Sequence, residues 1–307
     1  MNDSAPPHRG DAIAAVVVTY ESSSVLERCL KALLESAPRR PLNIRVVDNA
    51  SSDESPVIAS RVLGADHLVA MGSNRGYGAG VNAGFASARA SWYAVINPDV
   101  ETPPGSLDRM VDLLLEHPEA GMIGPRVQDG TGGFEDSVGL FPTLERERAH
   151  ALYLHRILGR EGRFRPFPEK TAEVDWTSGC AWMIRAEALA DAGRLDEEYF
   201  MYHEDVDFCR RMHDAGWSVL ATPDVTVSHL RGTGSKRTGL LPADGGPALV
   251  RYFTKFHPEI PEAEVRRVLR RGWRLRAAWH GLRARLGNSR SAALEQRYRL
   301  ALERVVS

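Results

Sequence analysis

The 307-residue sequence is poor in cysteine, in aromatic side chains and in long hydrophobic runs. Its three cysteines, Cys29, Cys180 and Cys209, include no close pair, which disfavours both a disulfide framework and a zinc site. The longest apolar runs, such as 13–18, are far shorter than the ~20 residues of a membrane-spanning helix. Residues 1–11 lack the apolar segment of a signal peptide and are expected to form a mobile leader. We therefore expect a cytoplasmic protein without a membrane span.

What is present is the composition of a folded protein. Hydrophobic residues make up 43% of the chain and charged residues 26%, which excludes intrinsic disorder and collagen and provides for a sizeable core. At roughly 150 residues a domain, the length suits one large domain with a small one, or two of moderate size.

The net charge of −1 conceals a basic C-terminal segment. Residues 262–307 contain twelve Arg and four Glu, a local charge of +8, which leaves −9 on the remainder. The region 241–307 is therefore expected to be helical, basic and amphipathic, and either to pack on the body or to lie in an anionic membrane interface. The expected apolar stripe comprises Val265, Val268, Leu269, Leu275, Trp279, Leu282 and Leu286, with Arg267, Arg270, Arg271, Arg274 and Arg285 opposite.

Short apolar segments alternate with helical patterns in the first hundred residues, which predicts an α/β fold with a mostly parallel sheet covered on both faces. An insertion at 130–173 with a weaker pattern is expected to be partly ordered. The expected strands are 13–19, 44–48, 67–70, 92–96, 174–184, 218–221 and 225–229, with helices at 26–34, 185–189 and 203–215.

Polar side chains follow four consecutive predicted strands, where parallel sheets bind ligands. Loops in α/β proteins are polar in any case, but carboxylates or amides at four strand ends are a less probable coincidence. They are Thr19, Tyr20 and Glu21, then Asp48 and Asn49, then Asn74 to Asn82, and then Asn97 and Asp99.

The glycine-rich run 74–84 superficially resembles a dinucleotide-binding motif, because Gly78, Gly80 and Ala83 satisfy its spacing. That motif belongs at the first strand-to-helix turn, which here is the glycine-free segment 20–23. A nicotinamide-dependent oxidoreductase is therefore disfavoured. The glycines are better explained by a helix N-terminus that closely approaches a ligand or a neighbouring backbone.

Two acidic motifs carry candidate chemistry. Asp99, in an Asn-Pro-Asp turn, could bind Mg²⁺ or Mn²⁺ bridged to a diphosphate, although such a turn alone is usually only a turn. Asp205 belongs to a carboxylate cluster at a helix start, where acidic residues also favour the helix dipole. The mostly apolar segment 200–202 before it could raise the basicity of a neighbouring carboxylate enough for general-base catalysis. His229 begins a cationic segment ending at Arg237, which could close over phosphates.

These segments together resemble the inverting family 2 glycosyltransferases, and most closely their bacterial rhamnosyltransferase-like branch, from about residue 13 to residue 237. The resemblance implies a GT-A catalytic domain over 12–240, a nucleotide-sugar donor, Mg²⁺ or Mn²⁺ as cofactor, and direct displacement at the anomeric carbon. The matching segments are Val18-Thr-Tyr20, Val47-Asp-Asn-Ala-Ser51, Asn74-Arg-Gly-Tyr-Gly-x-Gly-x-Asn82, Asn97-Pro-Asp-Val100 and Glu204-Asp-Val-Asp-x-Cys-Arg210.

By motif position, the resemblance implies Asp205 as general base, Asp99 as metal ligand and His229 as a residue that completes the metal shell. The family's metal motif is commonly Asp-x-Asp, so Asn97 in its first position makes metal affinity depend on the bound diphosphate. The donor nucleotide is expected at Thr19, Glu21, Asp48, Asn49, Asn74, Gly76, Asn82 and Asn97, and its diphosphate also at Arg231, Ser235 and Arg237. The acceptor is expected beside Trp176, Gly179, Trp182, Glu204 and the insertion at 130–173.

Rhamnosyltransferase-like members use dTDP-rhamnose, but related sequences use UDP-sugars with similar nucleoside motifs, and a carboxylate reads thymine and uracil alike. The favoured function is rhamnosyl transfer to a saccharide in cell-wall or surface polysaccharide synthesis. A polyprenyl-diphosphate-linked acceptor suits a tail that binds the cytoplasmic face of the membrane. The alternatives are a UDP-hexose-dependent transferase and a catalytically silent nucleotide-sugar binder. Nucleic-acid binding is disfavoured because no base-reading motif accompanies the arginines.

Overall fold

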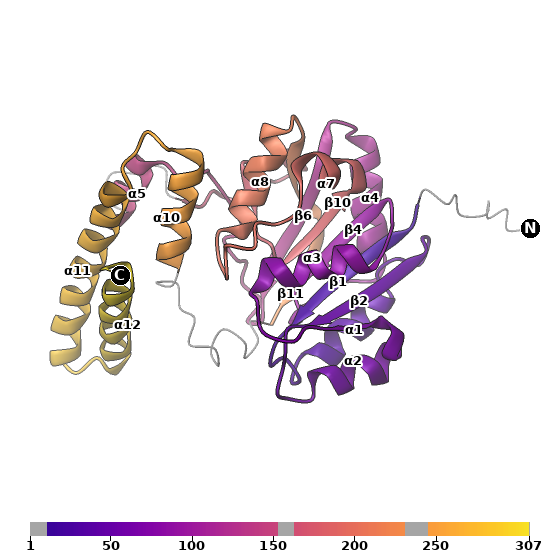
Figure 1. Cartoon of the computed structure of the whole chain (residues 1–307), viewed down its shortest axis with the longest axis horizontal. Coiled ribbons are helices and arrows are strands. Elements are labelled where there is room, and N and C mark those ends of the chain that lie inside the picture. Colours follow the sequence, from indigo (N-terminus) through magenta and orange to yellow (C-terminus); the bar gives the residue numbers. More distant parts are fainter. Residues whose placement is uncertain (1–10, 153–162, 231–244, 307) are drawn as a thin grey trace, which may run out of the picture.

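The computed structural model describes residues 11–152, 163–230 and 245–306, with the side chains of 289–290 and 304–306 excepted (Figure 1). Most of the expected leader and the segment containing Arg231, Ser235 and Arg237 lie outside these residues. A mixed sheet with helices on both faces forms the larger part of the molecule, and a helical lobe lies beside it (Figure 1).

The central sheet confirms the predicted mostly parallel α/β architecture. Its order is β3-β2-β1-β4-β10-β6-β11-β5, and β10 is antiparallel to both of its neighbours, while β8 pairs with β11. The strands are β1 (Ile13–Thr19), β2 (Leu42–Asp48), β3 (Leu68–Ala70), β4 (Trp92–Ile96), β5 (Val100–Glu101), β6 (Ala120–Asp129), β8 (Ala172–Glu173), β10 (Ala181–Arg185) and β11 (Ser218–His229).

Two strand predictions need correction. The segment predicted as one strand over 174–184 is broken into β9 (Trp176–Thr177) and β10 by a turn at 178–180, and β9 pairs with β7 (Val138–Gly139) in a separate small sheet. The two short strands predicted at 218–221 and 225–229 form one continuous strand, β11, with a register shift after Thr222. Both differences arise from pairing with residues distant in the sequence.

Helices cover both faces of the sheet, and β1 supplies side chains to each. Alternate residues of this buried strand, among them Val17 and Val18, point to opposite cores. The glycines of the third helix allow close packing, because a Cβ added at Gly80 or Gly84 would lie 2.6 or 2.2 Å from a valine of β1. One face carries α1 (Leu26–Leu34), α2 (Ser55–Leu63) and α4 (Ser106–Glu116), and the other carries α3 (Tyr77–Ser87), α7 (Ala186–Ala192) and α8 (Glu204–Asp214); a 3₁₀ turn, η1 (Ala65–His67), precedes β3.

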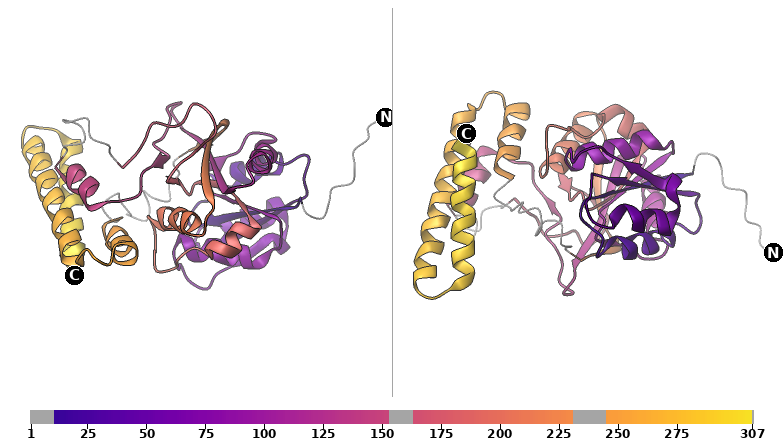
Figure 2. Two further views of the ribbon diagram at one scale, coloured as in Figure 1. Left: turned by 90° about the horizontal axis from the view of Figure 1, so that it is seen from above. Right: turned by 60° about the horizontal axis from the view of Figure 1, so that its bottom comes forward.

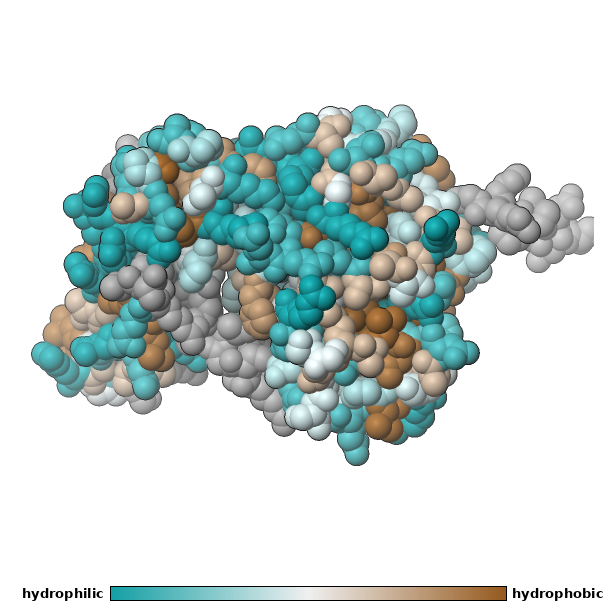
Figure 3. Space-filling model, in the orientation of Figure 1, coloured by the Kyte–Doolittle hydropathy of each residue, from teal (hydrophilic) through white to brown (hydrophobic). Residues whose placement is uncertain are grey.

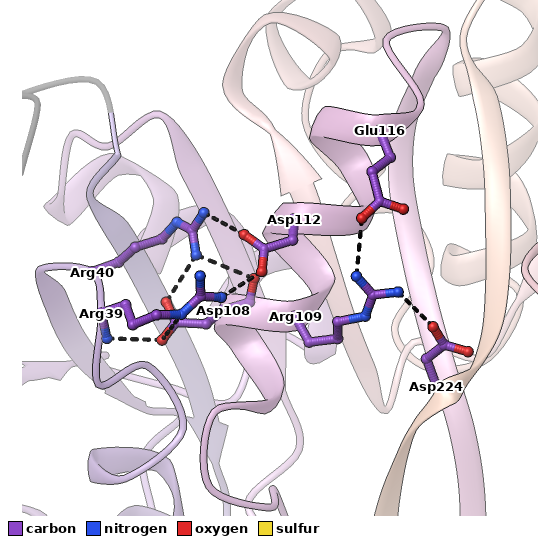
Figure 4. A network of polar contacts seen from close by, with 7 residues as sticks. All are labelled: Arg39, Arg40, Asp108, Arg109, Asp112, Glu116 and Asp224. Atoms are coloured by element: carbon purple, nitrogen blue, oxygen red, sulfur yellow. Dashed lines mark hydrogen bonds and ion pairs between the residues drawn. The ribbon is translucent and has the colours of Figure 1, made fainter.

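Ion pairs fasten α4 to its neighbours (Figure 4). The buried carboxylate of Asp108 accepts from the backbone N–H of Arg39 at 2.8 Å and from the guanidinium of Arg40 at 3.0 Å. Further along the helix, Arg109 pairs with Asp224 of β11 at 2.7 Å. These bonds connect α4 both to the segment that leads into β2 and to β11, near the opposite edge of the sheet.

The helical lobe combines the C-terminal region with part of the insertion (Figure 2). It contains α5 (Leu144–Ala151), α10 (Gly245–Phe256), α11 (Glu262–Arg285) and α12 (Ser289–Val306). The insertion at 130–173 is thus more regular than expected, since it includes a helix whose first turn is capped by the Thr143 hydroxyl. Leu249, Phe253 and Trp273 are buried in the core of this lobe, while Tyr252 of α10 packs into the core between the central sheet and α3, α7 and α8.

The predicted apolar stripe of the tail is buried only in its first half. Val265, Val268 and Leu269 are buried, whereas Leu275, Trp279, Leu282 and Leu286 are all more than half exposed. α5 packs on the first half of the stripe, where a Cβ added at Gly272 would lie 2.8 Å from Ala151, whereas the second half of α11 packs on α12 through another face, where a Cβ added at Gly281 would lie 2.9 Å from the Glu295 side chain. Within the described ranges, no helix is both long and apolar enough to span a membrane.

Candidate active site

Strained backbone marks the carboxyl edge of the sheet. In the described part of the chain, four non-glycine residues have positive φ: Glu21 at 52°, Ala50 at 66°, Tyr202 at 70° and His203 at 63°. The first two follow β1 and β2, and the other two directly precede α8, which begins with Glu204 and Asp205. Such conformations cost free energy and concentrate at functional sites.

The residues predicted for the nucleoside do come together at the ends of β1 and β2. Thr19 is paired with Asp48 in the parallel register, and both are buried. The Asp48 carboxylate accepts from the Ser51 N–H at 3.2 Å, and burial raises the pKa of this carboxyl group. Glu21 accepts from the backbone N–H of Ser52 at 2.6 Å. The carboxylates of Asp48 and Glu21 therefore lie along one polar surface.

The amide of Asn49 is used to fix the glycine-rich loop. Its Nδ2 donates to Asn74 Oδ1 at 2.9 Å and to the Gly76 carbonyl at 3.0 Å. Gly76 has φ of 90°, and an added Cβ would lie 2.4 Å from the Phe200 carbonyl oxygen. The loop is thus pressed against the segment that leads into α8, which couples the donor side to the start of that helix.

The expectation that Asn82 lines the pocket needs correction. This side chain is 4% exposed, and its amide bonds to the backbone of Leu195 at 2.9 and 3.0 Å and to Glu197 at 3.0 Å. Its hydrogen bonds therefore join α3 to the segment before α8. The position of Asn82 in the glycine-rich motif could not show which way its side chain points, because that direction depends on how α3 packs.

Asp99 and His229 meet as the motif positions imply. Asp99 Oδ1 lies 3.2 Å from His229 Nε2, and Glu135 Oε1 lies 3.2 Å from the other ring nitrogen. Burial alone would lower the pKa of His229, but the two carboxylates outweigh burial and raise it to about 9. Sequence reasoning missed Glu135, whose only signal was an acidic pair, 135–136, inside the insertion.

The oxygen and nitrogen atoms around Asp99 could together bind a divalent cation that is also bound by a ligand. Asn97 Oδ1 is buried and has no hydrogen-bond partner among the described residues. Within those residues, no group of three or more His, Cys, Asp or Glu is arranged to bind a metal by itself. A carboxylate and an imidazole supplemented by phosphate oxygens are a suitable set for Mg²⁺ or Mn²⁺, which commonly bind through few protein ligands.

Asp205, the second residue of α8, lies against Gly179. Its Oδ2 accepts from the Gly179 N–H at 3.3 Å and its Oδ1 from the Val206 N–H at 2.8 Å. Burial raises the pKa of Asp205 despite these bonds, and burial likewise raises that of Glu204. The hydroxyl of Tyr77, at the start of α3, donates to the Gly179 carbonyl at 2.9 Å. A carboxylate of increased basicity is therefore held rigidly.

A cavity of about 380 Å³ opens beside Asp205 and is lined by residues of the sheet-containing part of the molecule and of the helical lobe. Trp176 lines it as expected, but Trp182 does not, since its fully buried ring stacks on Phe208 in the core. Sequence reasoning missed the contribution of the lobe, because it arises from packing between distant segments. The lobe and insertion contribute Glu147, His150, Arg163, Phe164, Leu269, Trp273, Arg276 and Tyr298.

Comparisons with known proteins agree with this geometry. The model of the family described as glycosyl transferase family 2 matches residues 14–193. An N-acetylglucosaminyl-diphospho-decaprenol L-rhamnosyltransferase of Mycobacterium tuberculosis is 34% identical over 242 residues, which cover 71% of this chain and 76% of the relative. The low-salt glycan biosynthesis hexosyltransferase Agl10 of Haloferax volcanii is 27% identical over 66% of this chain and 61% of its own length.

Solved structures show the same fold at low sequence identity. A mannosyltransferase of Pyrobaculum calidifontis in complex with GDP-Man and Mn²⁺ superposes with a TM-score of 0.56 at 17% identity, covering 99% of this chain and 87% of that one. The S. aureus TarS 1–349 structure with UDP also gives 0.56, at 16% identity, over 84% of this chain and 69% of that one. By its sequence match and its architecture, the chain belongs to glycosyl transferase family 2 and is a glycosyltransferase with a GT-A fold.

Proposed function

We propose that this glycosyltransferase moves rhamnose from dTDP-rhamnose, with inversion, to a hydroxyl of a polyprenyl-diphosphate-linked saccharide in cell-wall or surface polysaccharide synthesis. The observation that carries the proposal is the basic carboxylate of Asp205 at a sugar-sized cavity. The Mycobacterium tuberculosis relative, whose name specifies a lipid-diphosphate acceptor and rhamnose, supports the substrate class.

The donor nucleoside is assigned to the polar surface at the ends of β1 and β2. Asp48 accepts the N3–H of the pyrimidine, and Thr19 and Glu21 contact the rest of the nucleoside. Asn49, Asn74 and Gly76 shape the loop beside it through the hydrogen bonds described above. Because uracil presents the same N3–H, a UDP-hexose is the second candidate donor.

Asp99 and His229 would hold the Mg²⁺ or Mn²⁺, with Asn97 beside them and Glu135 orienting the imidazole. When bound, the cation supplies positive charge that stabilises the departing diphosphate. We assign Arg231, Ser235 and Arg237 to the same diphosphate, since they follow directly after His229 in the sequence.

Asp205 acts as the general base. It removes the proton of the acceptor hydroxyl, whose oxygen attacks the anomeric carbon from the face opposite the diphosphate. The bond between the anomeric carbon and the diphosphate oxygen breaks, and the proton remains on Asp205. The raised pKa increases the basicity of the carboxylate, and the bond from Gly179 orients it.

The acceptor saccharide is assigned to the cavity between Trp176 and Trp273. Aromatic rings with acidic and basic neighbours suit a sugar, which presents apolar C–H faces and hydroxyl edges. Glu204 directly precedes Asp205 and has one buried carboxylate oxygen without a hydrogen-bond partner in the described part of the chain, which supports its assignment to the acceptor side, although it does not itself line the cavity. A lipid-linked acceptor places the enzyme at the cytoplasmic face of a membrane.

The test is transfer from a donor panel to a lipid-diphosphate N-acetylglucosamine acceptor. dTDP-rhamnose, UDP-glucose, UDP-galactose and UDP-N-acetylglucosamine are each offered with Mn²⁺ or Mg²⁺, and the anomeric configuration of the product is read by NMR. We expect turnover of dTDP-rhamnose alone, with inversion. Selective use of a UDP-sugar would replace the donor assignment, and retention of configuration would overturn the mechanism.

A further inference from the structure

We propose that the exposed apolar face of the second half of α11 docks on an anionic lipid bilayer. We call this face the α11 ridge and define it as Leu275, Trp279 and Leu282 of the helix and Leu286 at its C-cap, which are 51, 55, 54 and 78% exposed. The inference deepens the proposed function, since it names the surface by which the enzyme reaches a lipid-linked acceptor. It rests on residues outside the catalytic site.

The α11 ridge is continuous along one side of the helix. Its residues are spaced by four, three and four positions, which places all of them on one face of an α-helix. The opposite face, which includes Trp273, Ala277 and Gly281, is buried against the rest of the lobe. The ridge is therefore not needed to hold α11 in place, and it exposes a row of large apolar side chains that soluble surfaces ordinarily avoid.

The charge around the ridge specifies the partner. Residues 265–294 contain nine Arg and no Asp or Glu. Arg274, Arg283 and Arg285 are exposed on the same half of the helix, with Arg271 just before it, and apolar and hydrophilic residues adjoin on the lobe at the lower left of Figure 3. A second copy of this chain would bring the same positive charge to the contact. Nucleic acid would satisfy the arginines but not the leucines.

An anionic bilayer surface satisfies both kinds of side chain. Leucine and tryptophan enter the boundary between head groups and acyl chains, while arginines reach the phosphates. Tryptophan is favoured at this depth because its ring is apolar and its N–H is polar. The exposed Trp279 at the middle of the ridge fits this environment.

Docking would also bring the acceptor cavity close to the lipid. Trp273 and Arg276 line the cavity from the same helix, on the side away from the ridge. An α-helix with its side chains is only about 10–12 Å across. A membrane-anchored saccharide could therefore reach Asp205 without leaving the bilayer surface.

The experiment measures co-flotation of the full chain with vesicles of phosphatidylcholine alone or with 30 mol% phosphatidylglycerol, at low and high salt. We expect binding to the anionic vesicles that is at least tenfold weaker in the triple variant Leu275→Ser, Trp279→Ser, Leu282→Ser. The matched control is Val57→Ser, Leu115→Ser, which removes comparably exposed side chains from the catalytic domain. Circular dichroism checks that each variant is folded.

Activity assays separate this inference from the proposed function. The triple variant should transfer sugar to a water-soluble acceptor analogue at the wild-type rate. Its rate of transfer to an acceptor embedded in anionic vesicles should be at least tenfold lower than that of wild type. Equal flotation of the triple variant and the control would overturn the docking surface. So would a concentration-dependent dimer that the same three substitutions abolish, or binding to DNA stronger than binding to anionic vesicles. Transfer of a sugar other than rhamnose would leave the docking result intact.

Discussion

The proposed donor half and the proposed acceptor half of the site are built in different ways. The donor half consists of short segments at the ends of β1, β2, β3 and β4, with His229 at the end of β11, so each residue is positioned by the strand before it. The acceptor half gathers β9, the start of α8, the insertion and the helical lobe around one cavity. The first is therefore a property of the GT-A sheet, and the second is a property of how this chain packs its additional segments.

The two halves meet at only a few points. Gly76 of the donor loop contacts the backbone before α8, and Glu135 of the insertion contacts His229 at the proposed metal site. These contacts allow the two halves to be separated experimentally. Substitutions in one half should leave ligand binding in the other unchanged, whereas substitutions at the junctions should affect both.

Of the substitutions that test the two halves and their junctions, Asp99→Ala in the donor half is expected to have the largest effect. Loss of the only carboxylate in the Asn-Pro-Asp turn should lower transfer by roughly 10²- to 10³-fold, a typical loss for one electrostatic group at a developing charge. Calorimetry should show weaker Mn²⁺ binding in the presence of dTDP, with acceptor binding unchanged. Unchanged Mn²⁺ affinity would remove Asp99 from the metal site.

Gly76→Ala tests the first junction. A non-glycine residue at φ of 90° is strained, and the added Cβ would meet the Phe200 carbonyl at 2.4 Å. We expect a loss of about 2 kcal/mol in the free energy of unfolding, together with weaker donor binding. Gly72→Ala is the control, because no atom lies within 4 Å of its added Cβ and its φ is not in the left-handed region. Equal urea midpoints for the two variants would contradict the close contact.

Glu135→Gln tests the second junction. Removing the carboxylate from one side of His229 should weaken Mn²⁺ binding about tenfold, because a carboxylate partner fixes the orientation of a ligating imidazole. Calorimetry with dTDP present measures the affinity, and Glu135→Asp should restore part of it. Asp136→Asn, at the neighbouring position, should leave Mn²⁺ affinity unchanged. Equal losses in the Asp136 and Glu135 variants would indicate a general effect on the insertion.

Trp273→Phe gives the smallest expected effect and reports on the acceptor half. Shrinking one wall of the cavity should raise the acceptor KM about threefold to tenfold, within the range for a changed apolar contact, and leave the donor KM unchanged. Trp217→Phe is the control, since the indole of Trp217 bonds Asp191 away from the cavity. A shift in the donor KM with an unchanged acceptor KM would contradict the assignment of Trp273 to the acceptor half.

The same division explains what the sequence could predict. Thr19 lies beside Asp48, and Asp99 lies beside His229, as the sequence led us to expect, because parallel strands end at one edge and the alternation of strands and helices is visible locally. Glu135 was missed because its contact with His229 spans almost a hundred residues. Trp182 and Asn82 lay in the expected segments, but which way a side chain points depends on packing that no local pattern records.

The tail shows the same limit. The predicted helix is present, and Val265 and Leu269 of its apolar stripe are buried. How much of the stripe would be covered depended on α5, a helix that the weak pattern of the insertion did not predict. The second half of α11 thus has two faces, one packed on the rest of the lobe and one exposed.

The most direct test of the account compares Asp205→Asn with wild type in transfer and in donor binding. Loss of the general base should lower kcat by about 10²- to 10⁴-fold while the Kd for the donor changes less than twofold, because the base acts in the transition state. Asp214→Asn, an exposed position at the end of the same helix, is the control. The predicted result is loss of turnover with intact donor binding. Turnover within tenfold of wild type in Asp205→Asn would contradict the assignment of Asp205 and with it the mechanism.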